Sequence, residues 1–169
     1  MVHAGVVPTA EATRDGRRYE ILDGRLLVTG PQPPAHHAAV IALMVQLKHA
    51  CPSDLLVAVG SLPFRPTPTT TLRPDLMVCH RDTPVTEPPV LAVEVISATT
   101  RTTDVVLKRA LYETHRIPSY WLLDPTTQEL TILELTPTGY TCQAVLQSEE
   151  SFEAIHPFPI TLTPATLCS

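Results

Sequence analysis

Two acidic residues near the middle of the chain, Asp75 and Glu94, have surroundings that make their carboxylates chemically informative. Glu94 lies within residues 90–96, where every other residue is apolar, and burying an ionised carboxylate without a partner costs several kcal/mol. Asp75 directly follows Pro74 at the start of another apolar run. The charge of Glu94 therefore needs a partner, which a metal ion, a basic side chain or a proton could supply.

The pair is more informative than either residue alone. Taken singly, Glu94 could form a structural salt bridge or stand at a strand end that reaches solvent, and Asp75 could start a turn. The two residues lie on separate predicted strands that can be neighbours in one sheet, and converging carboxylates repel each other unless a cation lies between them. Carboxylate oxygens suit Mg²⁺ and Mn²⁺. We therefore predict that Asp75 and Glu94 hold a divalent metal ion in a site of the nuclease type.

The helix predicted after Glu94 supplies a third set of candidate residues. Asp104, Lys108, Tyr112 and His115 recur at a spacing that puts them on one helix face, and Asp104 and Lys108 form a favourable i,i+4 ion pair. This face could be a solvated charged stripe. If it faces the two carboxylates instead, Lys108 would position an attacking water and stabilise charge in the transition state, and Asp104 would orient Lys108.

The rest of the sequence predicts the elements that would position these residues. Residues 19–28 are typical of a β-hairpin around Asp23-Gly24, a dipeptide that adopts positive φ in tight turns. Helices are predicted over residues 36–50 and 104–115. Strands are predicted over residues 55–59, 62–65, 72–80, 90–96, 119–123, 129–135 and 140–146. This order predicts an α/β domain in which a mixed sheet has a helix packed on each side.

The composition indicates one globular domain that is short of charge. A length of 169 residues suits a single domain, which we expect over residues 18–169 after an N-terminal arm at residues 1–17. Only 17% of the residues are charged, which leaves apolar surface for self-association and favours a homodimer. The net charge of −5 argues against tight non-specific binding to nucleic acid, although bound divalent cations would offset carboxylates locally.

Several features favour a cytoplasmic protein. The cysteines form no C-x-x-C pair and no zinc-type spacing, which favours buried thiols in a reducing compartment; they are Cys51, Cys79, Cys142 and Cys168. Residues 1–10 lack the basic start and the apolar stretch of a signal peptide. No window approaches the roughly 20 apolar residues of a membrane span. We therefore predict a cytoplasmic protein that does not cross a membrane.

Four short motifs occur in the order found in a known family. They are RPD at residues 73–75, LAVEVIS at 91–97, D-x-x-x-K-x-x-x-Y at 104–112 and IPSYWLLDP at 117–125. With the hairpin and the proline-rich turn before His36-His37, they make the chain resemble the Uma-two family of restriction endonucleases, within the PD-(D/E)xK nuclease superfamily. The resemblance covers residues 19–169, and the ordered series is more specific than any single motif.

The resemblance implies a restriction-endonuclease-like core and Mg²⁺-dependent hydrolysis of phosphodiester bonds in DNA, with Mn²⁺ as an alternative ion. By position, Asp75 and Glu94 would be the two acidic ligands, and the backbone carbonyl of Val95 would be a further metal ligand. The superfamily places a lysine two residues after the second acidic residue, where this chain has Ile96. Lys108 is therefore the natural substitute, reaching the site from the helix.

Weaker candidates and other functions stay open at the level of the sequence. Glu20 and His37 are weaker candidates for a ligand or a substrate contact, and Tyr112 is a supporting residue. The acidic net charge and the displaced lysine also suit a catalytically inactive, dimeric binding or assembly module, because a fold does not fix a function. A third alternative is hydrolysis of a small phosphoester or nucleotide.

Overall fold

The computed structural model describes residues 16–60 and 62–168. Of the N-terminal arm predicted over residues 1–17, all but Gly16 and Arg17 lies outside the described residues. The boundary predicted at residue 18 therefore stays a prediction. None of the helices in the described ranges is long and apolar enough to cross a membrane.

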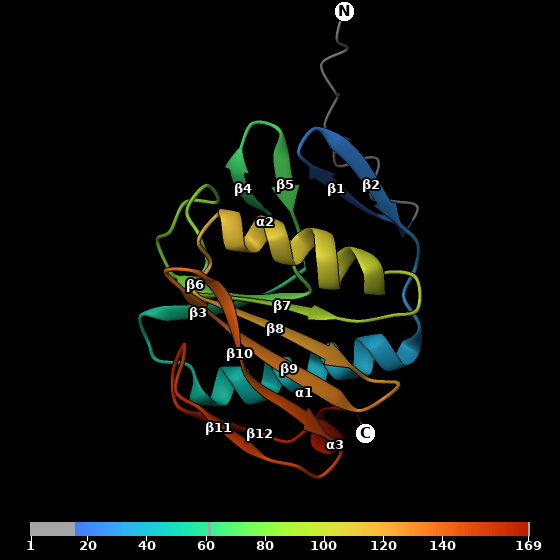
Figure 1. Cartoon of the computed structure of the whole chain (residues 1–169), viewed down its shortest axis with the longest axis vertical. Coiled ribbons are helices and arrows are strands. Elements are labelled where there is room, and N and C mark those ends of the chain that lie inside the picture. The colour runs from blue at the N-terminus through green and yellow to red at the C-terminus, as the bar shows by residue number, and fades with distance from the viewer. Residues whose placement is uncertain (1–15, 61, 169) are drawn as a thin grey trace, which may run out of the picture.

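A six-stranded mixed sheet forms the centre of the fold (Figure 1). β7 and β8 run parallel, and the chain between them forms the helical crossover that parallel neighbours require. The other neighbouring strands of this sheet run antiparallel. In the order β10-β9-β8-β7-β6-β3, the strands are β10 (Gly139–Gln147), β9 (Glu129–Thr136), β8 (Ser119–Asp124), β7 (Leu91–Val95), β6 (Leu76–His80) and β3 (Leu55–Val59).

The predicted hairpin belongs to a second, four-stranded sheet. Asp23 and Gly24 at its tip have φ angles of 49° and 79°, as a type I′ turn requires. The sheet lies above α2 in Figure 1, on the side away from α1. In the order β2-β1-β5-β4, its strands are β2 (Arg25–Thr29), β1 (Arg18–Leu22), β5 (Thr70–Leu72) and β4 (Phe64–Thr67).

Helices cover both faces of the central sheet, and successive side chains of β7 point to opposite faces. Val93 packs in an apolar cluster with α1, whereas Ala92 packs in a second cluster with Tyr112. Because side chains alternate along a strand, Glu94 faces the second helix. The helical segments are α1 (Pro34–Ala50), η2 (Thr103–Lys108), α2 (Arg109–Thr114) and α3 (Pro164–Leu167), and the short strands β11 (Phe152–Ala154) and β12 (Ile160–Leu162) pair near the C-terminus.

Residues 72–80, predicted as one strand, are divided between the two sheets. β5 ends at Leu72 and β6 begins at Leu76. Pro74 has no N–H to donate to a ladder, and the N–H of Arg73 donates to the side chain of Glu20 instead of to a neighbouring strand. The break leaves Asp75 at the junction of the two sheets, where side chains from both can reach it. The strand predicted over residues 62–65 likewise begins later, as β4.

Candidate active site

Asp75 lies at this junction with only 3% of its surface exposed. Its Oδ2 accepts hydrogen bonds from the backbone N–H of Val95 at 2.8 Å and from Nε2 of His36 at 3.2 Å. Its Oδ1 pairs with the guanidinium of Arg18. Burial opposes ionisation, but the hydrogen bond from His36 and the charge of Arg18 hold the pKa of Asp75 well below its usual value. Asp75 is therefore a carboxylate with one oxygen fixed by α1 and β7.

Glu94 shows the same division between its two oxygens. Oε1 accepts hydrogen bonds from Nζ of Lys108 at 3.0 Å and from the hydroxyl of Tyr112 at 2.6 Å. Oε2 faces the other way and lies 3.9 Å from Nη1 of Arg18. Burial raises the pKa of Glu94 well above its usual value, and the negative charges of the neighbouring carboxylates raise it further. Added positive charge near Oε2 would therefore stabilise the ionised form of Glu94.

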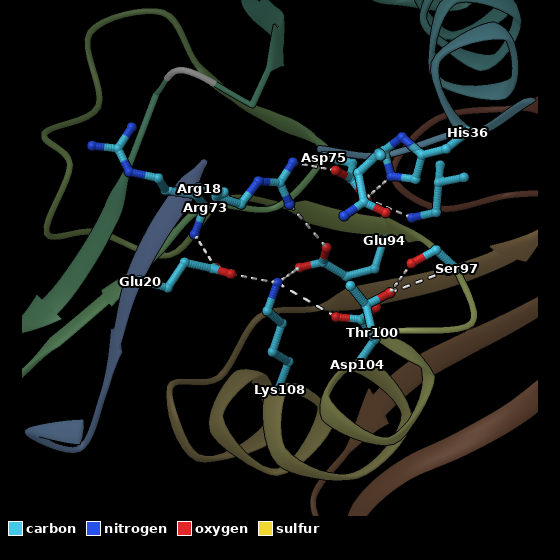
Figure 2. Close-up of polar contacts among 12 residues, drawn as sticks. Arg18, Glu20, His36, Arg73, Asp75, Glu94, Ser97, Thr100, Asp104 and Lys108 are labelled. Atoms are coloured by element: carbon cyan, nitrogen blue, oxygen red, sulfur yellow. Dashed lines mark hydrogen bonds and ion pairs between the residues drawn. The ribbon is translucent and has the colours of Figure 1, made fainter. Parts of the chain in front are cut away.

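Lys108 lies at the centre of a carboxylate cluster (Figure 2). Besides Glu94, its ammonium nitrogen lies 2.9 Å from Oε2 of Glu20 and 3.5 Å from Oδ1 of Asp104. An ammonium has three N–H donors, so each carboxylate can take one. Burial favours the neutral amine, but Glu94, Glu20 and Asp104 together raise the pKa of Lys108 above its usual value. The stripe of Asp104, Lys108 and Tyr112 is thus buried against the site and is not a solvated face.

A π-helical turn in η2 brings Lys108 over Glu94. Such turns are rare and often occur at functional sites. Within it, Val106 and Leu107 are 56% and 53% exposed, whereas Lys108 is 2% exposed. Ile96, at the position where the superfamily carries its lysine, is buried in the apolar cluster that contains Tyr112. The amine of Lys108 therefore reaches Glu94 from the helix and not from the strand.

Strand β1 adds two charged side chains from the small sheet. Glu20, 1% exposed, binds the N–H of Arg73 at 2.7 Å as well as Lys108. Arg18 bridges Asp75 and Glu94, and these carboxylates outweigh the effect of burial to raise the pKa of Arg18. Arg18 was not predicted from the sequence. The sequence pattern that could have pointed to Arg18 is the two-residue period of a strand, which puts Arg18 and Glu20 on one face.

The two neighbouring histidines at the start of α1 have different surroundings. His36 is 4% exposed and contacts Asp75, whereas His37, the histidine chosen from the sequence, is exposed. Successive residues of a helix point in different directions, so only one of the two can face the carboxylate. Of the predicted helix face, His115 also lies away from the cluster and packs edge-on against Phe64.

A cavity of about 170 Å³ opens beside these residues. Its walls include Arg18, Asp75, Glu94, Val95 and Lys108. The end of β2 and the connection that follows it, together residues 29–32, line it from one side, and Thr99, Thr100 and Thr103 from the helical crossover line it from the other. At roughly 30 Å³ per water molecule, the cavity has room for an ion with several waters.

A comparison with known protein families agrees with this architecture. Residues 8–167 match the family described as "Uma2: Putative restriction endonuclease". The chain belongs to the Uma2 family. The resemblance predicted from the four ordered motifs is therefore confirmed.

A solved structure shares the fold of this Uma2 chain. It is described as a "putative nuclease belonging to DUF820" from Anabaena variabilis, with a TM-score of 0.67, 15% sequence identity and 88% of each chain covered. At this identity the likeness speaks for the fold alone, and it confirms the predicted restriction-endonuclease-like α/β architecture. None of the curated proteins compared with the chain matches it.

The oxygens of the Uma2 site suit a divalent metal ion, the kind of cofactor that restriction-endonuclease-like folds imply. In the two described ranges, no three His, Cys, Asp or Glu side chains form a metal-binding group. Two carboxylate oxygens, Oδ1 of Asp75 and Oε2 of Glu94, instead face one cation, the Arg18 guanidinium. The N–H of Val95 points at Asp75, and the N–H and C=O of one strand residue point the same way. The carbonyl of Val95 is thereby directed toward the same place.

The charge balance of the site also suits such an ion. Four buried carboxylates lie close together with two side chains of fixed positive charge, and the imidazole of His36 lies beside one of the carboxylates. With all six groups ionised, the cluster carries an excess of two negative charges, which a divalent cation would neutralise. The six are Glu20, Asp75, Glu94, Asp104, Arg18 and Lys108.

Proposed function

We propose that this Uma2 protein is a metal-dependent endonuclease that hydrolyses phosphodiester bonds in DNA. The observation that carries the proposal is the pair of oxygens, Oδ1 of Asp75 and Oε2 of Glu94, that face one cationic position. Their partner oxygens are held by protein donors. Asp75, Glu94 and the carbonyl of Val95 would hold Mg²⁺, or Mn²⁺ in its place, because these ions prefer oxygen ligands.

When bound, the ion would lower the pKa of a coordinated water and stabilise charge on the phosphate. The chain's own residues would orient the reacting groups. Lys108 fixes Oε1 of Glu94 and so sets the direction of Oε2, and its ammonium would stabilise negative charge on a phosphate in the adjacent cavity. Glu20 and Asp104 hold Lys108 in place, which limits the motion of the amine during the reaction.

A plasmid-nicking assay tests this function directly. We expect the wild-type protein to nick supercoiled DNA with Mg²⁺ or Mn²⁺ and not with EDTA. Asp75→Asn and Glu94→Gln should each lower the rate by at least about 100-fold, the scale expected for removing a group that stabilises a transition state. Asp82→Asn, an exposed aspartate outside the site, is the matched control. Equal nicking by the wild type and Asp75→Asn would rule out the assigned site.

Two observations favour a second candidate function, a catalytically inactive nuclease-fold module for binding or assembly. Three carboxylates surround Lys108, and Arg18 already lies between the two candidate metal ligands. The two functions differ in their response to metal. For the nuclease, we expect millimolar Mn²⁺ to raise the melting temperature. An unchanged melting temperature together with no nicking would support the inactive module.

We also propose that the protein is a homodimer in the cytoplasm. Ile41 and Val45, one turn apart on α1, are 58% and 44% exposed, and burial of such apolar surface between two copies would stabilise a dimer. Light scattering after gel filtration should give the mass of two chains, and Ile41→Glu should give the mass of one. Cell fractionation would test the location, for which free cysteines are the supporting observation.

A further inference from the structure

The position between the two candidate metal ligands is occupied by a side chain of the protein itself. Arg18 pairs closely with Oδ1 of Asp75, and its other terminal nitrogen lies 3.9 Å from Oε2 of Glu94. These two oxygens face Arg18, whereas Oδ2 of Asp75 and Oε1 of Glu94 accept their hydrogen bonds from other groups of the protein. They are the oxygens that a metal ion would need. Arg18 and a metal ion therefore require the same space and the same charge partners.

Arg18 is held less firmly than the other cation of the site. Its side chain is 25% exposed, whereas that of Lys108 is 3% exposed. Lys108 lies within 3.5 Å of three carboxylates, while Arg18 has one close carboxylate and one looser one. Arg18 is also the first residue of β1, so its side chain stands at the end of the small sheet. Of the two cations, Arg18 is the one that can leave.

A second cavity lies on the other side of Arg18 and offers it a place to go. This outer cavity, of about 330 Å³, shares Arg18, His36, Asp75 and residues 30–32 with the inner one. Arg18 therefore forms part of the wall between them. Among the described residues that line the outer cavity, four are basic and only Asp75 is acidic. The basic ones are Arg17, Arg18, His36 and His37. Such a lining suits an anion.

We propose that Arg18 is a displaceable counter-ion: a divalent metal entering between Asp75 and Glu94 expels its guanidinium, which then binds a phosphate of the nucleic-acid substrate in the outer cavity. Two cations cannot share the gap because they repel each other. A guanidinium released there keeps its charge and its forked donors, which match phosphate geometry. This inference rests on the proposed function, because it requires metal binding at the two carboxylates.

Calorimetric titration with Mn²⁺ tests the first half of the exchange. Arg18→Gln removes the competing charge, and we expect it to tighten Mn²⁺ binding roughly tenfold, which corresponds to about 1.4 kcal/mol. Arg25→Gln is the matched control, because Arg25 is exposed at the other end of the same hairpin; its Mn²⁺ affinity should equal that of the wild type. Arg18→Lys keeps the charge but not the forked donors, so its Mn²⁺ affinity should lie between those of Arg18→Gln and the wild type. It takes the place of Arg18→Gln if that variant does not fold without metal.

Binding of a fluorescent DNA duplex in EDTA tests the second half without metal or cleavage. Asp75→Asn removes the close partner of Arg18, so the freed guanidinium should raise duplex affinity several-fold over the wild type. The double variant Asp75→Asn/Arg18→Gln should lose that gain. Equal affinities of the single and the double variant would overturn the phosphate contact, because removing a phosphate-binding cation lowers affinity for any sequence.

The titrations separate a failure of this inference from a failure of the proposed function. Mn²⁺ binding with the same affinity by the wild type and Arg18→Gln, together with none by Asp75→Asn, would support the metal site and overturn the exchange. Binding by Arg18→Gln but not by the wild type would support the exchange in its strongest form. Binding by neither would overturn the metal site, and the inference with it.

Discussion

Lys108 and Glu94 form a buried ion pair, with 3.0 Å between Nζ and Oε1, although one residue comes from a helix and the other from a strand. The packing of η2 on the central sheet sets this distance, since the two residues are not neighbours on one element. The same pair fixes the direction of Oε2 of Glu94, which faces Arg18. The amine thus positions a candidate metal ligand as well as standing close to the place of reaction.

Replacing Lys108 should therefore affect both catalysis and stability. We expect Lys108→Met to lower the nicking rate by at least about 100-fold, because it removes a group placed to stabilise transition-state charge. Breaking a buried ion pair by removing one partner costs about 3–5 kcal/mol, so the melting temperature should also fall. Mn²⁺ should restore part of the lost stability, because a divalent ion offsets the carboxylates left behind.

The matched control for this variant is Lys48→Met, which removes the same charge from an exposed position near the end of α1. We expect its nicking rate and melting temperature to stay close to those of the wild type. A folded Lys108→Met protein, verified by circular dichroism, that nicks DNA at the wild-type rate would rule out the role assigned to Lys108.

The neighbouring histidines allow a clean comparison on α1. His36 donates to Oδ2 of Asp75, and removing a partner that orients a metal ligand typically lowers metal affinity 10- to 100-fold. We expect His36→Ala to weaken Mn²⁺ binding by at least about tenfold on that basis. His37→Ala should leave Mn²⁺ affinity unchanged, because the side chain of His37 is exposed. Equal effects of the two substitutions in calorimetric titrations would contradict the assignment of His36.

The raised pKa of Glu94 predicts how stability without metal should depend on pH. Burial and neighbouring carboxylates raise the pKa of Glu94 in the folded protein, so the folded state holds this proton at pH values where the unfolded chain, with a pKa of about 4.3, has lost it. Stability then falls as pH rises above that value. Asp104, whose pKa burial also raises, contributes in the same direction.

Urea unfolding between pH 5 and pH 8 in EDTA measures this dependence. A proton that is bound in the folded state and absent in the unfolded state changes the free energy of unfolding by about 1.4 kcal/mol per pH unit. We expect the free energy of unfolding of Glu94→Gln to depend less steeply on pH than that of the wild type, because a glutamine cannot ionise. The comparison cancels groups that titrate equally in both proteins. Mn²⁺ favours the carboxylate, so its stabilisation of the wild type should grow with pH. Identical slopes for the two proteins would show that Glu94 is ionised throughout this range.

Local chemistry made much of the fold predictable. Asp23-Gly24 specified the hairpin turn, and the apolar run around Glu94 specified a strand buried on both faces, as β7 is. Asp75 and Glu94 stood out because a carboxylate beside apolar residues needs a partner. Lys108 was predicted from the resemblance and from the absence of a lysine at position 96. Except for Lys108, each of these signals lies within a few residues of the position that it describes.

The residues that were missed depend on contacts between distant segments. Arg18 reaches Asp75 across 57 positions of the chain, and His36 reaches it across 39. Nothing near Arg18 shows that β1 begins beside the central sheet, since that placement follows from the pairing of β1 with β5. The choice between His36 and His37 depended on the rotation of α1 about its axis, which packing of its apolar face sets.

The displaced lysine can be tested by moving it back. Ile96 lies two residues after Glu94 on the same face of the chain, within an apolar cluster, so Ile96→Lys alone should lower stability by about 2 kcal/mol or more by burying an unpaired charge. In the Lys108→Met background, the carboxylates of Glu20 and Glu94 have lost their amine, and the new ammonium can pair with them. We expect the double variant to be more stable than the sum of the two single changes predicts, since contacting residues couple. We also expect it to nick DNA about tenfold faster than Lys108→Met, which corresponds to about 1.4 kcal/mol of transition-state stabilisation. Additive stabilities with no recovered nicking would mean that an amine on β7 cannot replace the one supplied by the helix.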